Sequence, residues 1–189
     1  MGQPSKEERE LLLAMYGQMW NNINRHVMVI WQSVTAIVGS LALFSLVEKG
    51  VIGLDMGTTF VVIIGAWLLA HTYDSSAWFN RNQSIISAIE KELLSAELAE
   101  RLHPVIGKRR SISDMVLQFR IQQWLALAIL LLVLGHHFVS RVLPGFGSPF
   151  TTFEAARAIP YVASTAAVVG LVLVRRKAYG VKDPDKSSP

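Results

Sequence analysis

The chain has 189 residues, of which 51 % are hydrophobic and 17 % charged, and it carries no cysteine and a formal net charge of +4. The charged fraction is below the ~25 % of a typical soluble domain. The lack of cysteine excludes a disulfide framework, a thiolate metal site and a cysteine nucleophile. The basic residues lie beside apolar runs, as in membrane proteins, so we expect no nucleic-acid partner.

Four uncharged runs are long enough to cross a membrane as helices. A hydrocarbon core of ~30 Å needs about 20 helical residues. The runs cover residues 27–47, 57–73, 121–140 and 158–174, and charged residues bound each of them. The sequence therefore predicts an all-α integral membrane protein with four transmembrane helices. We expect a single membrane domain over residues 1–179, followed by a disordered tail over 180–189.

The distribution of lysine and arginine predicts the orientation of these spans. Fifteen of the 18 basic residues fall before the first run, between the second and third, or after the fourth. The two remaining connections hold three. Because basic residues stay on the cytoplasmic side, we expect both termini and the long middle segment in the cytoplasm. The short loops favour a bacterial inner membrane.

The segment before the first span is predicted to be helical. Ser5 and Glu8 have the spacing of a capping box, and an apolar stripe at steps of three or four residues follows. We expect either one long helix over residues 6–47 or a surface helix joined to the span by a bend. The stripe then lies either in the lipid headgroup layer or against other cytoplasmic helices.

The segment 74–120 is predicted to form a cytoplasmic helical hairpin that extends the second and third spans. Its first arm, residues 74–102, is amphipathic, and Pro104 and Gly107 follow it. The arm either continues the second span or begins a new helix after a bend at Asp74. We expect its apolar face to bind a cytoplasmic partner, and this face comprises Trp78, Ile85, Ile86, Ile89 and Leu93.

Two further features are predicted at the start of the fourth helix. Thr151 and Glu154 have the spacing of a second capping box, so this helix is expected to begin before its span. Pro160 then falls in the first turns, where proline is tolerated or produces a kink.

Histidines near the ends of spans are candidates for a proton-sensing or metal site. These are His71, His136 and His137. Adjacent residues point to different sides of a helix, so His136 and His137 cannot share one ion through the usual i, i+4 spacing. The alternative is that all three are ordinary interfacial polar residues. The sequence predicts no catalytic residues, no metal site and no cofactor.

Small and polar side chains form one face on the first span and another on the fourth. Such faces allow close approach between helices of one subunit or of two, or line a polar pore. The candidates are Gln32, Ser33, Ala36, Ser40, Ala163, Ala167 and Gly170. Basic clusters next to the spans are candidate contacts for anionic lipid or phosphate, and they comprise Lys108, Arg109, Arg110, Arg175, Arg176 and Lys177.

Three functions remain open at this point. The first is a non-enzymatic, homo-oligomeric membrane anchor, sensor or adaptor for a cytoplasmic protein. The second is an ion channel or pore-forming effector, and the third is a lipid-modifying membrane enzyme. The plan of two spans, a helical extension and two further spans resembles small bacterial membrane proteins of unknown or defence-associated role, with residues 74–94 carrying the resemblance.

Overall fold

The computed structural model describes residues 4–95, 98, 117–147, 149 and 154–179, and this part of the chain is helical, without a β-strand. The long helices are α1 (Lys6–Glu48), α2 (Leu54–Leu93), α4 (Leu117–His137) and α5 (Ile159–Tyr179). A π-helical turn (Phe138–Val142) and a 3-10 turn (Leu143–Gly147) follow α4, and another 3-10 turn (Ala155–Ala158) precedes α5. Each of the four long helical segments is long and apolar enough to cross a membrane, as predicted.

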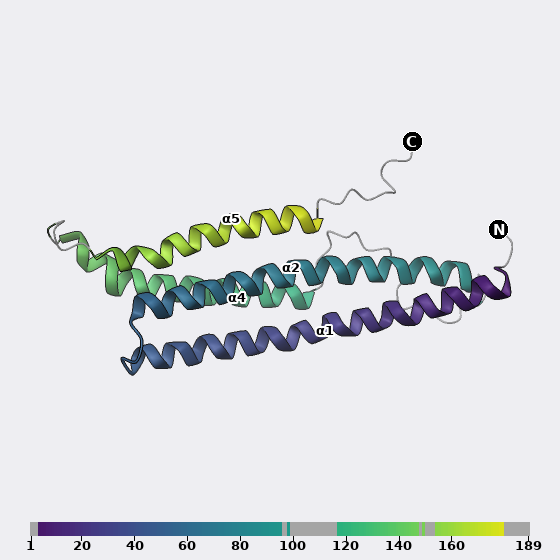
Figure 1. The fold of residues 1–189 in the computed structure, drawn as a ribbon, viewed down its shortest axis with the longest axis horizontal. Helices are drawn as coiled ribbons and strands as arrows, with labels where there is room; N and C mark the ends of the chain where they lie inside the picture. Colours follow the sequence, from purple (N-terminus) through teal and green to yellow (C-terminus); the bar gives the residue numbers. More distant parts are fainter. Residues whose placement is uncertain (1–3, 96–97, 99–116, 148, 150–153, 180–189) are drawn as a thin grey trace.

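Helix α2 is the centre of the bundle. It packs against α1, α4 and α5, whereas α1 and α4 barely contact each other. Helices that follow one another along the chain run in opposite directions, so the start of α1 and the end of α5 point toward the same end of the molecule (Figure 1). We call this the terminal end, and we call the opposite end, which holds the α1–α2 turn and the three short turns, the loop end.

Helix α1 is unbroken over 43 residues, because its N-terminus is capped and no breaker interrupts it. The Ser5 hydroxyl accepts a hydrogen bond from the Glu8 backbone N–H (3.3 Å), and the Ser5 N–H donates to the Glu8 carboxylate (2.7 Å). The predicted capping box and the single long helix are therefore confirmed.

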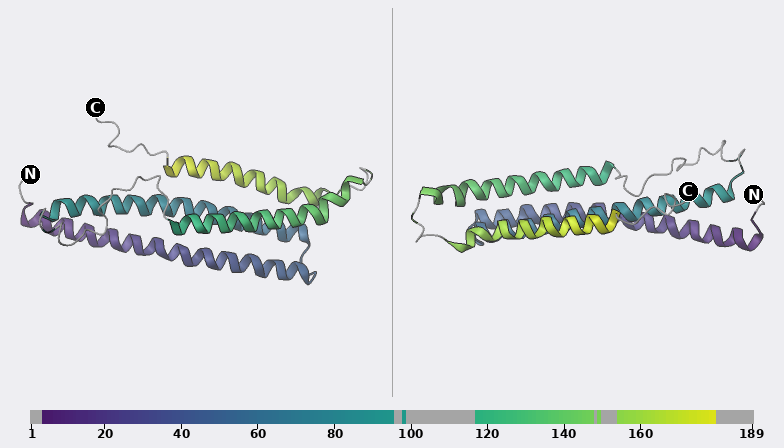
Figure 2. Two further views of the ribbon diagram at one scale, coloured as in Figure 1. Left: turned by 180° about the vertical axis from the view of Figure 1, so that it is seen from behind. Right: turned by 90° about the horizontal axis from the view of Figure 1, so that it is seen from above.

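Helix α2 runs through the predicted second span and on to Leu93 without a break, so the segment after Asp74 continues that span. At the terminal end α1 and α2 extend beyond α4 and α5 (Figures 1 and 2). We call residues 6–26 of α1 and 74–93 of α2 the projecting pair. Ile23 and Ile86 form its buried centre, with Tyr16, Trp20 and Phe79 among the residues packed around them.

One prediction about this segment was wrong, and another falls partly on residues that the structure does not describe. Helix α2 ends at Leu93 rather than near residue 102, because Leu94 is extended (φ −96°, ψ 128°). The Ser95 hydroxyl accepts from the Leu98 N–H (3.2 Å), which is the pattern of a residue that starts a new turn. The first arm packs against α1, and its Phe79 ring also meets Phe119 at the start of α4 (centroids 6.3 Å apart), while residues 99–116 of the predicted hairpin lie outside the described residues.

Inside the bundle, apolar side chains and one glycine set the spacing of the helices. Leu68 and Leu69 of α2 pack with Ala126 of α4. A Cβ atom at Gly65 would lie 2.8 Å from Leu130 Cδ2, so the close approach of α2 and α4 depends on this glycine. Of the most apolar stretch of α5 only 6 % is buried, against 39 % for α2. The outer helices therefore present apolar faces that suit lipid.

Candidate functional site

A polar network joins three helices at the loop end, and Asp55 is its centre. Asp55 lies in the first turn of α2, where the helix dipole favours a negative charge. Its Oδ1 atom accepts from His137 Nε2 (2.8 Å). Arg141 binds the same carboxylate with both Nε (3.1 Å to Oδ1) and Nη2 (3.0 Å to Oδ2). This bidentate pairing is the strong form of an arginine–carboxylate contact.

The network continues through Arg141 to the start of α5. Arg141 Nη2 also donates to Glu154 Oε2 (2.9 Å), and Arg157 Nη2 donates to Glu154 Oε1 (2.9 Å). Arg157 Nη1 donates to the backbone carbonyl of Arg141 (3.3 Å). The hydrogen bond from Arg157 is the main cause that holds the pKa of the Glu154 carboxyl below its ordinary value. The π-helical turn thus carries Arg141 to a position between two carboxylates.

His137 is fully buried between Asp55 and Tyr161. Its Nδ1 atom lies 3.0 Å from the Tyr161 hydroxyl, and the two rings meet edge to face with centroids 5.4 Å apart. In the tautomer with the proton on Nε2, that atom donates to Asp55, and Nδ1 accepts from the Tyr161 hydroxyl. We call Asp55, His137, Arg141, Glu154, Arg157 and Tyr161 the loop-end network. Its two carboxylates and two guanidinium groups pair with one another. These pairs connect the start of α2, the turn after α4 and the start of α5.

The histidine predictions have different outcomes in this arrangement. His136 is exposed and lies near Phe44, whereas its neighbour His137 is buried, so the two do point to different sides. The side chain of His137 faces the inside of the bundle. Among the described residues, no group of three side chains of the histidine, aspartate or glutamate type is placed to hold a metal ion.

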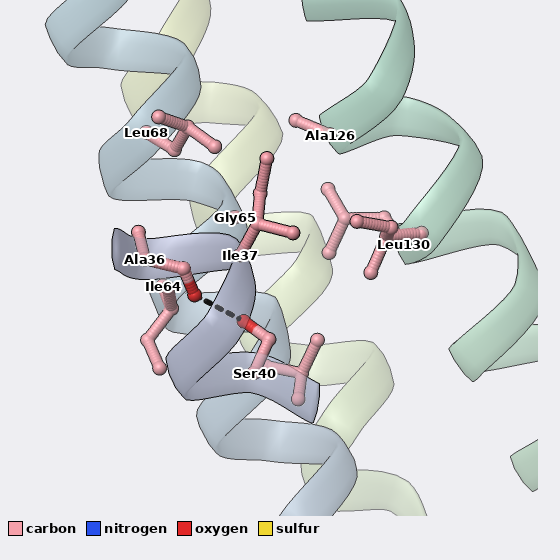
Figure 3. Close-up of a pocket in the computed structure, with 10 residues that line it drawn as sticks. Ala36, Ile37, Ser40, Ile64, Gly65, Leu68, Ala126 and Leu130 are labelled. Carbon is pink, nitrogen blue, oxygen red and sulfur yellow. Dashed lines mark hydrogen bonds between the residues drawn. The ribbon is translucent and has the colours of Figure 1, made fainter. Parts of the chain in front are cut away.

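The small-residue face of the first span divides into an inner and an outer part. Ser33 and Ser40 are buried, and the Ser40 hydroxyl donates to the Ala36 carbonyl (2.9 Å). Figure 3 shows Ala36 and Ser40 beside Gly65 of α2, around a cavity of about 10 Å³, which is the size of one water molecule. This inner part packs within the subunit.

Gln32 belongs to the outer part of that face. Its side chain is exposed, and its Oε1 atom lies 3.2 Å from His71 Nε2. The His71 ring stacks on the indole of Trp67, with centroids 5.0 Å apart. A hydrogen-bonded polar pair therefore lies on the outer surface of α1 and α2, toward the terminal end.

The remaining predicted residues occupy three places. Ala163, Ala167 and Gly170 are half-buried on α5, which packs on α2. On the predicted partner face, Ile86 and Ile89 are buried, Ile85 and Leu93 are half-buried, and Trp78 remains 46 % exposed with the Arg81 guanidinium 5.2 Å from its ring. Arg175, Arg176 and Lys177 are exposed at the end of α5, while Lys108, Arg109 and Arg110 lie outside the described residues.

The loop-end network was not predicted as a unit from the sequence. Asp55, Arg141 and Arg157 were used as boundaries of spans, and Glu154 as a capping residue. Thr151, its predicted partner in the capping box, lies outside the described residues. One signal was present: the topology places charges of both signs, near the ends of three spans, on the side that carries few basic residues. Such charges at a membrane surface are expected to pair.

Comparison with known proteins does not assign the chain to a family. No family model matches the chain, and neither a characterised protein nor a solved structure shows significant similarity to it.

Proposed function

We propose that the chain is a non-enzymatic, multipass adaptor of a bacterial inner membrane. In this proposal the bundle anchors and assembles the subunits, and the projecting pair recruits a cytoplasmic protein. The excess of basic residues supports a cytoplasmic terminal end. The exposed tryptophans Trp31, Trp67 and Trp124 support a membrane boundary near that end, because each falls within six residues of the corresponding edge of a predicted span.

The observation that carries the proposal is the length of α1 and α2 compared with the membrane. At 1.5 Å per residue, the 43 residues of α1 measure about 64 Å, roughly twice the hydrocarbon thickness. The projecting pair therefore extends into water. It nevertheless exposes large apolar side chains, with Leu11 at 62 %, Leu13 at 52 % and Trp78 at 46 %. Apolar surface outside a membrane is characteristic of a protein-binding face.

The chemistry of the loop end supports a non-enzymatic function. The carboxylates and guanidinium groups of the loop-end network pair with one another, and His137 is fully buried, so each of these groups already has a partner within the protein. At the terminal end, the exposed Arg175, Arg176 and Lys177 suit contact with anionic lipid headgroups. Such contacts would keep the end of α5 at the cytoplasmic surface of the membrane.

A site-specific photo-cross-linker tests whether a partner protein binds the projecting pair at Leu11. We expect a photoreactive residue at Leu11 in cell membranes to give an adduct of one defined mass. The same residue at Lys91, which is exposed on the projecting pair, is the matched control and should give little. Equal labelling at both positions, or none at Leu11, would contradict recruitment through this face.

The exposed Gln32–His71 pair also favours a second candidate, an oligomeric pore with this pair toward its axis. That function predicts ion flux from purified protein in liposomes and its loss in Gln32→Leu. The adaptor proposal predicts no flux in either protein, so one assay separates the two functions.

A further inference from the structure

A layer of polar side chains lies inside the bundle, between α2 and α4. On α2, Thr72 and Ser76 follow each other by one helical turn, and both are fully buried. On α4, the side chain of Gln122 is only 6 % exposed. Its neighbour Gln123 donates from Nε2 to Thr72 Oγ1 (3.3 Å), so the two helices meet through polar groups here. We call Thr72, Ser76, Gln122 and Gln123 the α2–α4 polar layer.

Apolar side chains enclose this layer along the helix axes. Toward the loop end, Leu68 of α2 and Ala126 of α4 belong to one buried apolar cluster (Figure 3). Toward the terminal end, the rings of Phe79 and Phe119 meet edge to face, with centroids 6.3 Å apart, and Phe119 is buried. The polar layer is therefore a separate compartment of the α2–α4 contact, with apolar packing before and after it.

Ser76 and Gln122 occupy the same height in this compartment. Helices α2 and α4 run in opposite directions, so both residues fall between the contact of Thr72 with α4 and the contact of the two phenylalanine rings. Ser76 lies four residues after Thr72, and Gln122 lies three residues after Phe119, so each shares a helix face with a residue that touches the other helix. The two side chains therefore face each other across the α2–α4 contact.

Both side chains carry a buried oxygen without a partner. Ser76 Oγ and Gln122 Oε1 have no hydrogen bond to the part of the chain that the structure describes. Such buried groups are unfavourable, and in folded proteins they are normally bonded to protein or to ordered water. A metal cation such as Ca²⁺ or Mg²⁺ takes about six oxygen ligands or more, which this layer does not supply. A single water molecule suits two facing oxygens better.

We propose that a water molecule is bound in the α2–α4 polar layer and bridges Ser76 to Gln122. The Ser76 hydroxyl donates to this water, and the water donates to Gln122 Oε1. Its second hydrogen goes to Thr72 Oγ1, which keeps one lone pair after donating to the Leu69 carbonyl (2.8 Å) and accepting from Gln123. The water thus makes about three hydrogen bonds, the usual number for a buried water.

The bridge gives α2 and α4 a different kind of connection from the one at the loop end. The paired charges there hold two side chains in direct contact. A bridging water reorients its donors and lone pairs, so it keeps the helices connected when α4 shifts by a small amount along α2. The inference concerns the inside of one subunit and does not rest on the proposed partner or assembly.

The sign of a stability change tests whether the Ser76 hydroxyl is bonded. Removing a bonded hydroxyl destabilises, whereas removing an unbonded one stabilises, so we expect Ser76→Ala to raise the unfolding equilibrium constant about five- to tenfold. Because one water serves both side chains, Ser76→Ala and Gln122→Met together should cost less than the sum of the two. A stabilised Ser76→Ala, or additive effects, would overturn the bridge.

The matched control for this pair of substitutions is Ser40→Ala combined with Gln122→Met. Ser40 is also a buried serine, but it lies on α1 and its hydroxyl donates to the Ala36 carbonyl of its own helix (2.9 Å). Its effect should add to that of Gln122→Met. Coupling of the same size in the control would show that the non-additivity is general, and would remove the support for a shared water.

Solid-state NMR of the full chain in lipid bilayers distinguishes water from a direct contact between the two side chains. Magnetisation transferred from water protons should reach the side-chain carbons of Ser76 and Gln122, and should be at least threefold weaker at the methyl group of the buried Ala126. Ser76→Val, which removes the hydroxyl and fills its space, should abolish the transfer at Gln122. Equal transfer at Gln122 and Ala126 in the wild-type protein would overturn the proposal.

Discussion

The two ends of the bundle are held together by different physical means. At the loop end, paired charges and a buried histidine connect α2, α4 and α5. At the terminal end, an apolar cluster around Ile23 and Ile86 joins α1 and α2, and the Tyr16 hydroxyl donates to the Glu90 carboxylate beside it (3.1 Å). The hydrophobic effect drives helix association only where water is present. The apolar cluster therefore suits the projecting pair, and directional polar contacts suit helices next to lipid.

The largest effect is expected at the centre of the loop-end network. Asp55→Asn removes the charge that faces Arg141 and His137, and so leaves a guanidinium without its main partner. We expect a loss of about 3 kcal/mol in the free energy of unfolding, as for other partly buried pairs that lose one member. Reversible unfolding in detergent would measure it.

The matched control for this substitution is Asp74→Asn, because Asp74 is exposed on the same helix. It should change stability little. If both variants were equally stable, the loop end would not depend on paired charge.

A slightly smaller effect is expected in the projecting pair. Ile86 is fully buried, so Ile86→Ala leaves a cavity and should cost about 2 to 3 kcal/mol. The loss should be local: amide hydrogen exchange should rise in residues 6–26 and 74–93 and stay unchanged at the loop end. Ile85→Ala, at a half-buried neighbour, should show a weaker version of the same pattern. Faster exchange at the loop end would show that the two ends are not independent.

A still smaller effect is expected at the start of α1. Ser5→Ala removes the hydroxyl that caps the Glu8 N–H and should cost about 1 kcal/mol. The change should appear as fraying of the first turns in hydrogen exchange. Ser5→Asp, which restores an acceptor, should recover most of the loss, and failure of this rescue would contradict a capping role.

The smallest effect is expected on stability at low pH, where protonation of Glu154 should weaken the loop end but not the projecting pair. The pKa of Glu154 is held below its ordinary value of 4.5, chiefly by the hydrogen bond from Arg157. Its contribution to stability is therefore present above that pH and is lost as the pH falls through the lowered pKa. Titration of stability below pH 5 should show a loss that Glu154→Gln removes, with hydrogen exchange in the projecting pair unaffected by that substitution. An identical acid profile in this variant would exclude Glu154 as the cause.

The elements of the fold were predictable to different degrees. The four apolar runs predicted four helices long enough to cross a membrane, because length and the absence of charge are local properties of the sequence. The capping box at Ser5 was local in the same sense. The predicted end of α2 was wrong because leucines continue every four residues at positions 94, 98 and 102, while the hydroxyl of Ser95 favours a new turn there.

The contacts between helices were harder to predict. Asp55 and His137 are 82 residues apart, and nothing near either residue specifies the other. Likewise, the stripe that contains Tyr16 fits a lipid surface as well as it fits α2, so only packing shows that α2 is its partner. The inner and outer parts of the α1 small-residue face could not be separated until the position of α2 was known.

The continuity of α1 and α2 has a mechanical consequence. A helix without a proline or a π-bulge is stiff over this length, and no such break separates the membrane part of α1 from its projecting part. Bilayers of different thickness change the tilt of the helices that span them. In the proposed topology, the 21 residues of α1 that precede the first span form a lever of about 31 Å, so a tilt of about 10° would move its tip by about 5 Å. A partner bound near Leu11 would thus be displaced by changes in membrane thickness, without any signal passing through the loop end.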